Sequence, residues 1–267
     1  MDNYNAKQIA QLTSATQAFY EQNAASFSQT RQRGWVGWTQ LVPYLSEVLH
    51  ETTSHEGITS HCFVLDVACG NFRFAGFLSE QFPESAWHIH GIDACDSLAS
   101  CIPELADHIT VSFEHEDIIA NLSKGKPLID DAHYDVAVCF GFMHHLPTVA
   151  LRQQLLEEMI SAIKPGGLIA LSFWRFLEDE KLAHKAAKTT DIGEVRLDIA
   201  MSDKQDRLLG WQNNTEQFRY CHSFSGEEID LLISSVSESI SVLDRYYADG
   251  KSGLLNEYVV LKRRKDR

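Results

Sequence analysis

The sequence predicts an α/β fold: a doubly wound, seven-stranded and mostly parallel sheet, with two extra helices at its amino terminus. Two observations predict it. From residue 62 onward, short apolar runs alternate with stretches of helical periodicity, which is the pattern of a parallel sheet covered by helices on both faces. The last two apolar runs are separated by residues 249–253, a glycine-containing joint that is typical of a hairpin and predicts an antiparallel last strand.

Two amphipathic helices are expected before the first strand. Apolar residues recur at helical spacing between Ile9 and Tyr20, and again between Trp38 and Leu49 after a polar break. Residues 1–60 are therefore expected to form a helical cap beside the sheet.

Seven strands are expected in the rest of the chain. They are residues 63–67, 88–92, 109–113, 134–140, 168–173, 241–247 and 257–261. A helical stripe after the fourth strand ends at the Pro-Gly-Gly turn of residues 165–167. Ser225, with Glu228 three residues later, predicts the start of a helix before the sixth strand.

Residues 175–222 interrupt this alternation, because they are charged and only weakly periodic. We expect an insertion or substrate lid there, placed within the same domain as a core formed by residues 61–174 and 223–267. Long segments of this kind often carry function.

The composition narrows the classes of protein. The first thirty residues are polar throughout and no apolar run reaches membrane-spanning length, so we expect a cytoplasmic protein. The six cysteines form no Cys-x-x-Cys pair, which predicts reduced thiols and neither a disulfide framework nor a zinc site. A net charge of −14 opposes broad electrostatic capture of nucleic acid, although it leaves room for a local basic patch.

Acidic residues follow three successive strands. Residues 64–71 form a buried strand that runs into a small-residue turn and then a helix, the place where an α/β sheet offers its ligand crevice. Asp93 ends the second strand, where its carboxylate can accept both hydroxyls of a ribose. Asp117, after the third strand, is placed to accept from an adenine amino group, with Ile118 packing on the ring.

This order of residues resembles the class I S-adenosylmethionine-dependent methyltransferases, which have a Rossmann-like fold. The turn at residues 165–167 and the antiparallel last strand are also typical of that family. The resemblance implies S-adenosylmethionine as the cofactor, held by Asp66, Ala68, Gly70, Asp93, Ala94, Asp117, Ile118, Cys139 and Phe140.

Two positions of the turn depart from the family pattern. Ala68 and Phe72 stand where its members more often carry glycine, and a phenylalanine makes a positive φ costly. A dehydrogenase is the competing use of such a turn. It is disfavoured because Ala68, Gly70 and Arg73 occupy the three glycine positions of the dinucleotide-binding fingerprint.

Two histidines follow the fourth strand, at the edge of the sheet where chemistry is expected. His144 and His145 suit metal ligation, but no third ligand is evident in the sequence, so no metal site is predicted. The alternatives are a buried structural role, which we assign to His145, and contact with cofactor or acceptor, which we assign to His144.

The amino-terminal segment resembles a particular group of methyltransferases, those that esterify 5-carboxymethyluridine at the wobble position of transfer RNA. In that group a Tyr, a Phe-Ser-x-Thr-Arg run and a Trp precede the core, as do Tyr20, residues 27–31 and Trp35 here. Further similarity occurs at His144 and His145 and in residues 168–174, 209–211 and 219–224.

This second resemblance implies roles for individual residues. Arg31 and His144 are the expected catalytic residues, with Arg31 holding the acceptor carboxylate, and also the methionine carboxylate of the cofactor, for in-line transfer. Because a carboxylate is ionised at neutral pH, no strong general base is needed. Tyr20 and Trp35 would wall the cofactor pocket. The expected border of the acceptor is Trp174, Tyr220 and His222.

The expected partners are transfer RNA or a small-molecule acceptor, with no membrane. A basic track for RNA would comprise Arg31, Arg33, Arg73, Arg207, Arg219 and residues 262–265. Members of the resembled group often act with a small activating protein docked on the sheet edge, which is a further expected partner. The acidic composition favours the alternative of a small-molecule carboxyl or hydroxyl methyltransferase. A non-catalytic cofactor-binding protein is the third reading, suggested by Phe72.

Overall fold

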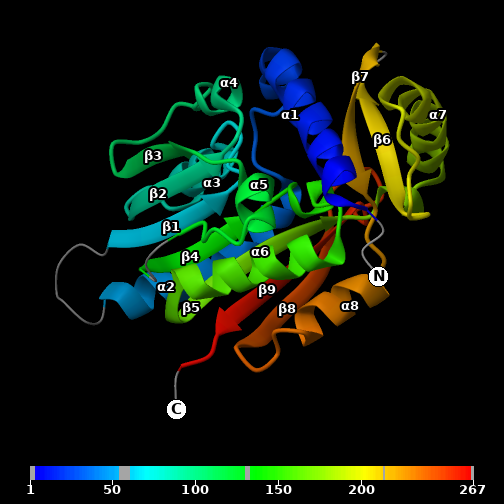
Figure 1. Cartoon of the computed structure of the whole chain (residues 1–267). Helices are drawn as coiled ribbons and strands as arrows, with labels where there is room; N and C mark the ends of the chain where they lie inside the picture. The colour runs from blue at the N-terminus through cyan, green and yellow to red at the C-terminus, as the bar shows by residue number, and fades with distance from the viewer. Residues whose placement is uncertain (1–3, 54–60, 130–132, 213, 266–267) are drawn as a thin grey trace.

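A single sheet of seven strands organises the computed structural model, which describes residues 4–53, 61–129, 133–212 and 214–265 (Figure 1). The strands lie in the order β3-β2-β1-β4-β5-β9-β8. Strands β1 to β5 pair in parallel, whereas β9 runs antiparallel to both β5 and β8. The bounds are β1 His61–Val67, β2 Ala86–Asp93, β3 Ile109–His115, β4 Tyr134–Cys139, β5 Ile163–Trp174, β8 Ile240–Ala248 and β9 Asn256–Arg263. The predicted fold, its seven strands and the closing hairpin are confirmed.

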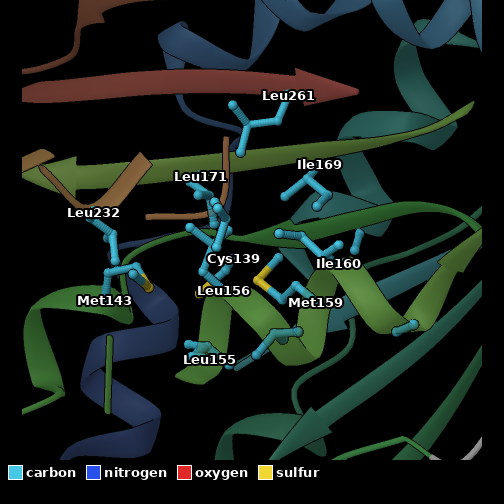
Figure 2. Close-up of a cluster of buried hydrophobic side chains, with 14 of the residues drawn as sticks. Cys139, Met143, Leu155, Leu156, Met159, Ile160, Ile169, Leu171, Leu232 and Leu261 are labelled. Atoms are coloured by element: carbon cyan, nitrogen blue, oxygen red, sulfur yellow. The ribbon is translucent and has the colours of Figure 1, made fainter. Parts of the chain in front are cut away.

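Helices cover both faces of this sheet. They are α1 Ala6–Gln29, α2 Val42–Thr53, α3 Arg73–Gln81, α4 Asp96–Ala99, α5 Ile118–Ser123, α6 Val149–Ala162 and α8 Gly226–Ser234, with short 3-10 helices η1 Val36–Leu41, η2 Met143–His145 and η3 Phe176–Glu178. One buried apolar cluster joins the sheet to α5, α6 and α8, and Figure 2 shows part of it. A second cluster joins the opposite face to η1, α2 and α3. None of the described helices is long and apolar enough to cross a bilayer.

The boundaries of several elements reflect local chemistry. Asn5 and Gln8 form a capping box that starts α1, and Ser225 with Glu228 forms the predicted one at α8. The second expected helix is divided, because a 3-10 segment precedes α2 and Pro43 occupies its first turn, where a missing N–H is tolerated. Strand β5 begins earlier than expected, with a register shift opposite β4.

The segment of residues 175–222 is regular, contrary to its weak periodicity. It forms α7 Glu180–Leu197 and an antiparallel pair, β6 Asp206–Trp211 and β7 Asn214–His222. This pair lies between α1 and α7, beside the main sheet (Figure 1). The buried face of α7 consists of Ala186, Thr190 and Gly193, and such small residues give almost no apolar signal.

A buried polar network fastens this hairpin to the rest of the molecule. The carboxylate of Asp206 accepts hydrogen bonds from the hydroxyls of Tyr4 at 2.7 Å and Tyr220 at 2.5 Å, and lies 2.7 Å from Nδ1 of His222. The other ring nitrogen of His222 is 2.9 Å from Glu228. The network therefore joins the amino terminus, β6, β7 and α8.

Candidate active site

A cavity of about 740 Å³ opens at the carboxyl ends of the parallel strands, within the size range of small-molecule sites. Segments far apart in the sequence meet on its walls. Thirteen of the residues expected at the site line it: Tyr20, Arg31, Trp35, Asp66, Ala68, Gly70, Asp93, Ala94, Asp117, Ile118, Phe140, His144 and Trp174.

The turn after β1 adopts left-handed backbone at three alternate residues. The φ angles are 59° at Ala68, 54° at Gly70 and 56° at Phe72. All three residues thus have the positive φ that favours glycine, although only one of them is a glycine. A β-carbon on Gly70 would have no neighbour within 4 Å, so this residue faces open space where a ligand can approach. Phe72 therefore adopts the positive φ that its side chain disfavours.

Burial of the Phe72 ring accounts for that backbone. The side chain is fully buried and packs over Gly91 of β2, where an added β-carbon would lie 2.4 Å from the ring. Left-handed backbone costs about 1–2 kcal/mol per non-glycine residue, whereas burying an aromatic ring contributes about 1.5–3 kcal/mol. The ring and Gly91 thus form a complementary pair that holds the turn, and Phe72 presents no obstacle to it.

We predict that Gly91→Ala will lower the free energy of unfolding by about 1–3 kcal/mol, because the methyl group overlaps Phe72 and the Cys69 sulfur. Urea denaturation measures this change. Gly226→Ala is the matched control, since its nearest contact is a flexible arginine at 3.7 Å, and it should be within about 0.5 kcal/mol of wild type. Equal stability of the two variants would contradict the packing argument.

Asp93 supports the turn as well as facing the cavity. Its two carboxylate oxygens accept from the backbone N–H groups of Gly70 at 2.9 Å and Cys95 at 2.8 Å. Burial raises the pKa of this carboxyl, and the backbone donors oppose that rise. The residue expected to bind a ribose is therefore also one that fixes the glycine turn against β2.

Asp66 lies at the centre of the site, almost fully buried in the last part of β1. Burial, reinforced by the nearby charge of Asp93, raises its pKa to about 7. In the unfolded chain this pKa lies near 4. Between pH 4 and pH 7 the unfolded chain therefore loses the Asp66 proton while the folded chain keeps it, so the free energy of unfolding falls as pH rises.

Asp66→Asn should remove that loss. Relative to wild type, the variant is expected to gain roughly 2–4 kcal/mol of unfolding free energy on going from pH 4.5 to pH 8. Urea denaturation of both proteins at the two pH values measures the difference. An identical pH dependence in wild type and variant would show that Asp66 titrates normally.

Asp117 also lines the cavity, and it caps the start of α5. Its carboxylate accepts from the backbone of Ala120 at 3.0 Å and from the Gln17 side chain of α1 at 2.8 Å. Ile118, the next residue, is buried against the core and contributes to the cavity wall. Helix α1 thus closes over this part of the site.

The two histidines differ in their surroundings. Nδ1 of His145 lies 2.7 Å from the carbonyl oxygen of Tyr220, and its Nε2 lies 2.9 Å from the hydroxyl of Tyr20. This ring joins α1 to β7, as a structural histidine would, and burial lowers its pKa to about 3. His144 packs beside Trp174 with its buried Nδ1 unpaired within the described residues. Burial holds the pKa of His144 well below its usual value, so its imidazole is neutral.

Cys221 completes a group that the sequence did not reveal. Its sulfur and the ring nitrogens of His144 and His145 have potential ligand atoms within 4.8 Å of one another. Both ring nitrogens of His145 already have hydrogen-bond partners, and burial raises the pKa of the Cys221 thiol to about 11 despite a nearby arginine. A metal needs deprotonated, available ligands, so this cluster is better explained as packing.

Three expected site residues do not line the cavity, and strand alternation explains each. Cys139 points into the apolar core, one residue before the cavity-lining Phe140 (Figure 2). Tyr220 and His222 lie on the buried face of β7, where both contact Asp206 of β6. The contacts expected of Cys139 with cofactor, and of Tyr220 and His222 with acceptor, therefore remain predictions for side chains that lie away from the cavity.

Arginines and aromatic rings make up the remaining wall. The guanidinium carbon of Arg31 lies 3.7 Å from the ring centre of Phe27 and 4.8 Å from that of Trp211. Burial, together with the charge of Arg219, lowers the pKa of Arg31 to about 10, which leaves it protonated at neutral pH. Arg73 stacks over Trp35 and Trp38 at 5.1 and 5.7 Å. The sequence suggested no contact with cofactor or acceptor for Arg73 or Arg219, and a place for both only in a general basic track for RNA.

The central part of the chain is similar to known methyltransferases. Residues 64–167 match the family model of a methyltransferase domain. A methyltransferase of Encephalitozoon cuniculi is 26% identical over 85% of this chain and 87% of its own length. The mouse tRNA (carboxymethyluridine(34)-5-O)-methyltransferase is 24% identical over 85% of this chain, which spans only 29% of that protein. A Rickettsia felis ubiquinone biosynthesis O-methyltransferase is 26% identical over 48% of each chain.

Solved structures share the fold. A Methanosarcina mazei S-adenosylmethionine-dependent methyltransferase superposes with a TM-score of 0.59 and 15% identity, covering 82% of this chain and 98% of its own. A chain from the complex of the Haloferax volcanii Trm112 methyltransferase activator with a methyltransferase gives a TM-score of 0.55 and 12% identity, over 94% and 99% of the two chains. The match over residues 64–167 is thus to a methyltransferase domain, and the fold is shared with S-adenosylmethionine-dependent methyltransferases.

Proposed function

We propose that this chain is a methyltransferase with S-adenosylmethionine as its cofactor, and that it esterifies the carboxylate of 5-carboxymethyluridine at the wobble position of transfer RNA. The observation that carries the proposal is Arg31. Its guanidinium is protonated, lies on the cavity wall that also includes His144, and forms no ion pair with an acidic residue in the described part of the chain. Because no carboxylate of the described protein pairs with the N–H groups of this guanidinium, they can bind a carboxylate of the acceptor.

Methyl transfer to an ionised carboxylate requires positioning of the acceptor oxygen more than proton transfer. Bound S-adenosylmethionine supplies a methyl group on a positively charged sulfur. With that cofactor bound, an acceptor carboxylate oxygen would take the methyl group with its own lone pair, and the electrons of the C–S bond would remain with the sulfur. No proton has to be removed, which agrees with a His144 whose lowered pKa makes it a weak base and which borders the acceptor instead. Arg31 holds the oxygen in line with the methyl group.

A second depression supports an RNA acceptor. This groove of about 600 Å³ adjoins the cavity through Arg31 and is lined by residues 29–33, Trp35, Arg73 and Trp211. It contains three arginines and two tryptophans and no acidic side chain, on a chain whose net charge is −14. Arginine contacts phosphate and tryptophan stacks on unpaired bases, so the groove is suited to nucleotides that flank the modified one.

The basic track is narrower than the sequence suggested. Lys262 binds Glu47 and Glu51, both at 3.1 Å, and Arg263 donates to backbone carbonyls near the end of α6. Arg207 donates to the carbonyl of Lys204. These residues serve contacts within the protein, and the RNA proposal rests on the groove alone. An activating subunit stays part of the proposal because one structural neighbour was solved with its activator.

Methyl transfer from labelled S-adenosylmethionine to total transfer RNA, followed by nucleoside analysis, tests the proposal. We expect label in the methyl ester of 5-carboxymethyluridine, and none with transfer RNA that lacks the carboxymethyl group. The assay is run with and without a Trm112-type activator. Label that enters only a small-molecule extract would instead favour a small carboxyl or hydroxyl acceptor, the candidate suggested by the likeness to the Rickettsia enzymes.

A further inference from the structure

Arg219 is a buried charge without a counter-charge. It comes from β7, is only 6% exposed, and lines the main cavity. Its Nε and Nη1 atoms are buried with no hydrogen-bond partner, and it forms no ion pair with an acidic residue among the described ones. The neighbouring Cys221 thiol is neutral, because burial raises its pKa to about 11. A buried, unpaired guanidinium is unfavourable for folding, so its presence calls for an explanation.

Arg152 of α6 provides a comparison within the same molecule. It is equally buried, at 5% exposure, but its Nε donates to the carbonyl of Leu146 at 3.0 Å and its Nη2 to the Tyr220 hydroxyl at 3.5 Å. It also lies outside the cavity lining. Arg152 has the contacts of a structural arginine, whereas Arg219 lacks them and borders a site where a ligand enters.

The surroundings of Arg219 are aromatic rings at the cavity. Its guanidinium carbon lies 4.5 Å from the ring centre of Phe19, 5.8 Å from Tyr20 and 6.0 Å from Trp211. Arg31 lies over the same Trp211 ring at 4.8 Å. Two guanidinium groups therefore lie near one indole, and both arginines line the cavity that also contains His144, while the indole itself lines the adjoining groove.

We propose that Arg219 is a second ligand of the acceptor carboxylate, which it and Arg31 hold between them beside Trp211. This inference rests on the proposed function, because it assumes a carboxylate acceptor. Two charged forks fix the orientation of both oxygens, and an uncharged amide of the same shape would leave the buried guanidinium unpaired. Arg219 therefore selects acids over their amides. Because the methyl ester product is neutral, the same contacts weaken once the methyl group is transferred.

Binding of two uridines separates this role from a structural one. With S-adenosylhomocysteine bound, calorimetry compares 5-carboxymethyluridine with 5-carbamoylmethyluridine, its neutral amide. Wild type should prefer the acid by about tenfold or more, and Arg219→Met should reduce that preference to about twofold. The affinity of Arg219→Met for S-adenosylhomocysteine alone should stay within about threefold of wild type. An unchanged preference for the acid in Arg219→Met would overturn the inference.

Thermal unfolding without any acceptor gives an independent readout. Arg219→Met should raise the melting temperature by roughly 3 °C or more, since it removes an unpaired buried charge, whereas Arg152→Met should lower it. A lowered melting temperature in both variants would assign Arg219 a structural role.

Failure of the proposed function is distinguishable from failure of this inference. If wild type binds neither uridine, the uridine acceptor is wrong, and phenylacetate with phenylacetamide then serves as the acid and amide pair. Stabilisation of wild type by phenylacetate alone, lost in Arg219→Met, would support the carboxylate site. Equal effects of acid and amide on wild type would refute it.

Discussion

Arg31→Ala is expected to lower the rate of methyl transfer by about 10³-fold, the largest functional effect that we predict. The variant loses a charged fork that orients the acceptor oxygen, while the turn and acidic residues of the cofactor site keep their contacts. Single-turnover methyl transfer measures the loss. Calorimetry with S-adenosylhomocysteine should show a change in affinity of no more than about fivefold, because Arg31 is one of many residues on this wall.

Two further variants test whether the loss comes from the charge or the shape of the Arg31 side chain. Arg31→Lys keeps the charge without the planar fork, so its rate should fall between those of wild type and Arg31→Ala. Arg196→Ala is the matched control, because this exposed arginine pairs with Glu216 and does not line the cavity, and its rate should equal that of wild type. Undiminished turnover in Arg31→Ala would sink the proposed mechanism.

The core of the fold was predictable because its signals are local. Buried parallel strands appear as continuous apolar runs, and the cofactor residues stand at the ends of those runs in chain order. The hairpin of β6 and β7 was not predictable in this way. Helix α7 packs against it through small residues, and a β-carbon on Gly193 would lie 2.9 Å from the Leu208 side chain. Close approach of two elements leaves no periodic apolar pattern in the sequence.

The expected site residues that lie away from the cavity have a common physical explanation. A strand presents alternate residues to opposite faces, so two neighbouring residues of one strand can point to the cavity and to the core, respectively. The sequence led us to Tyr220 and Cys139, whereas their neighbours Arg219 and Phe140 line the cavity. Burial of Arg219 depends on Phe19 of α1, about two hundred residues earlier in the chain, as well as on Trp211 of the neighbouring strand, and the local sequence does not predict it.

The largest effect on stability is expected at Asp206, where replacement by alanine should lower the free energy of unfolding by about 3–5 kcal/mol. The variant leaves the hydroxyls of Tyr4 and Tyr220 and the ring of His222 buried without their shared acceptor. Urea denaturation measures the change. Tyr4→Phe is the control, because it removes one donor and keeps the carboxylate paired, and should cost about 1 kcal/mol.

The Asp206 network also has a functional consequence, because it fixes the hairpin that carries Trp211 and Arg219. Tyr220 is anchored by Asp206 on one face of β7, and Arg219 next to it reaches the cavity from the other. At a temperature where Asp206→Ala remains folded, its KM for the acceptor should rise by about tenfold or more, while cofactor affinity changes little. Tyr4→Phe should leave both constants near wild type. A variant destabilised as predicted but with an unchanged KM would show that the hairpin holds its place without the network, and that the anchor serves stability alone.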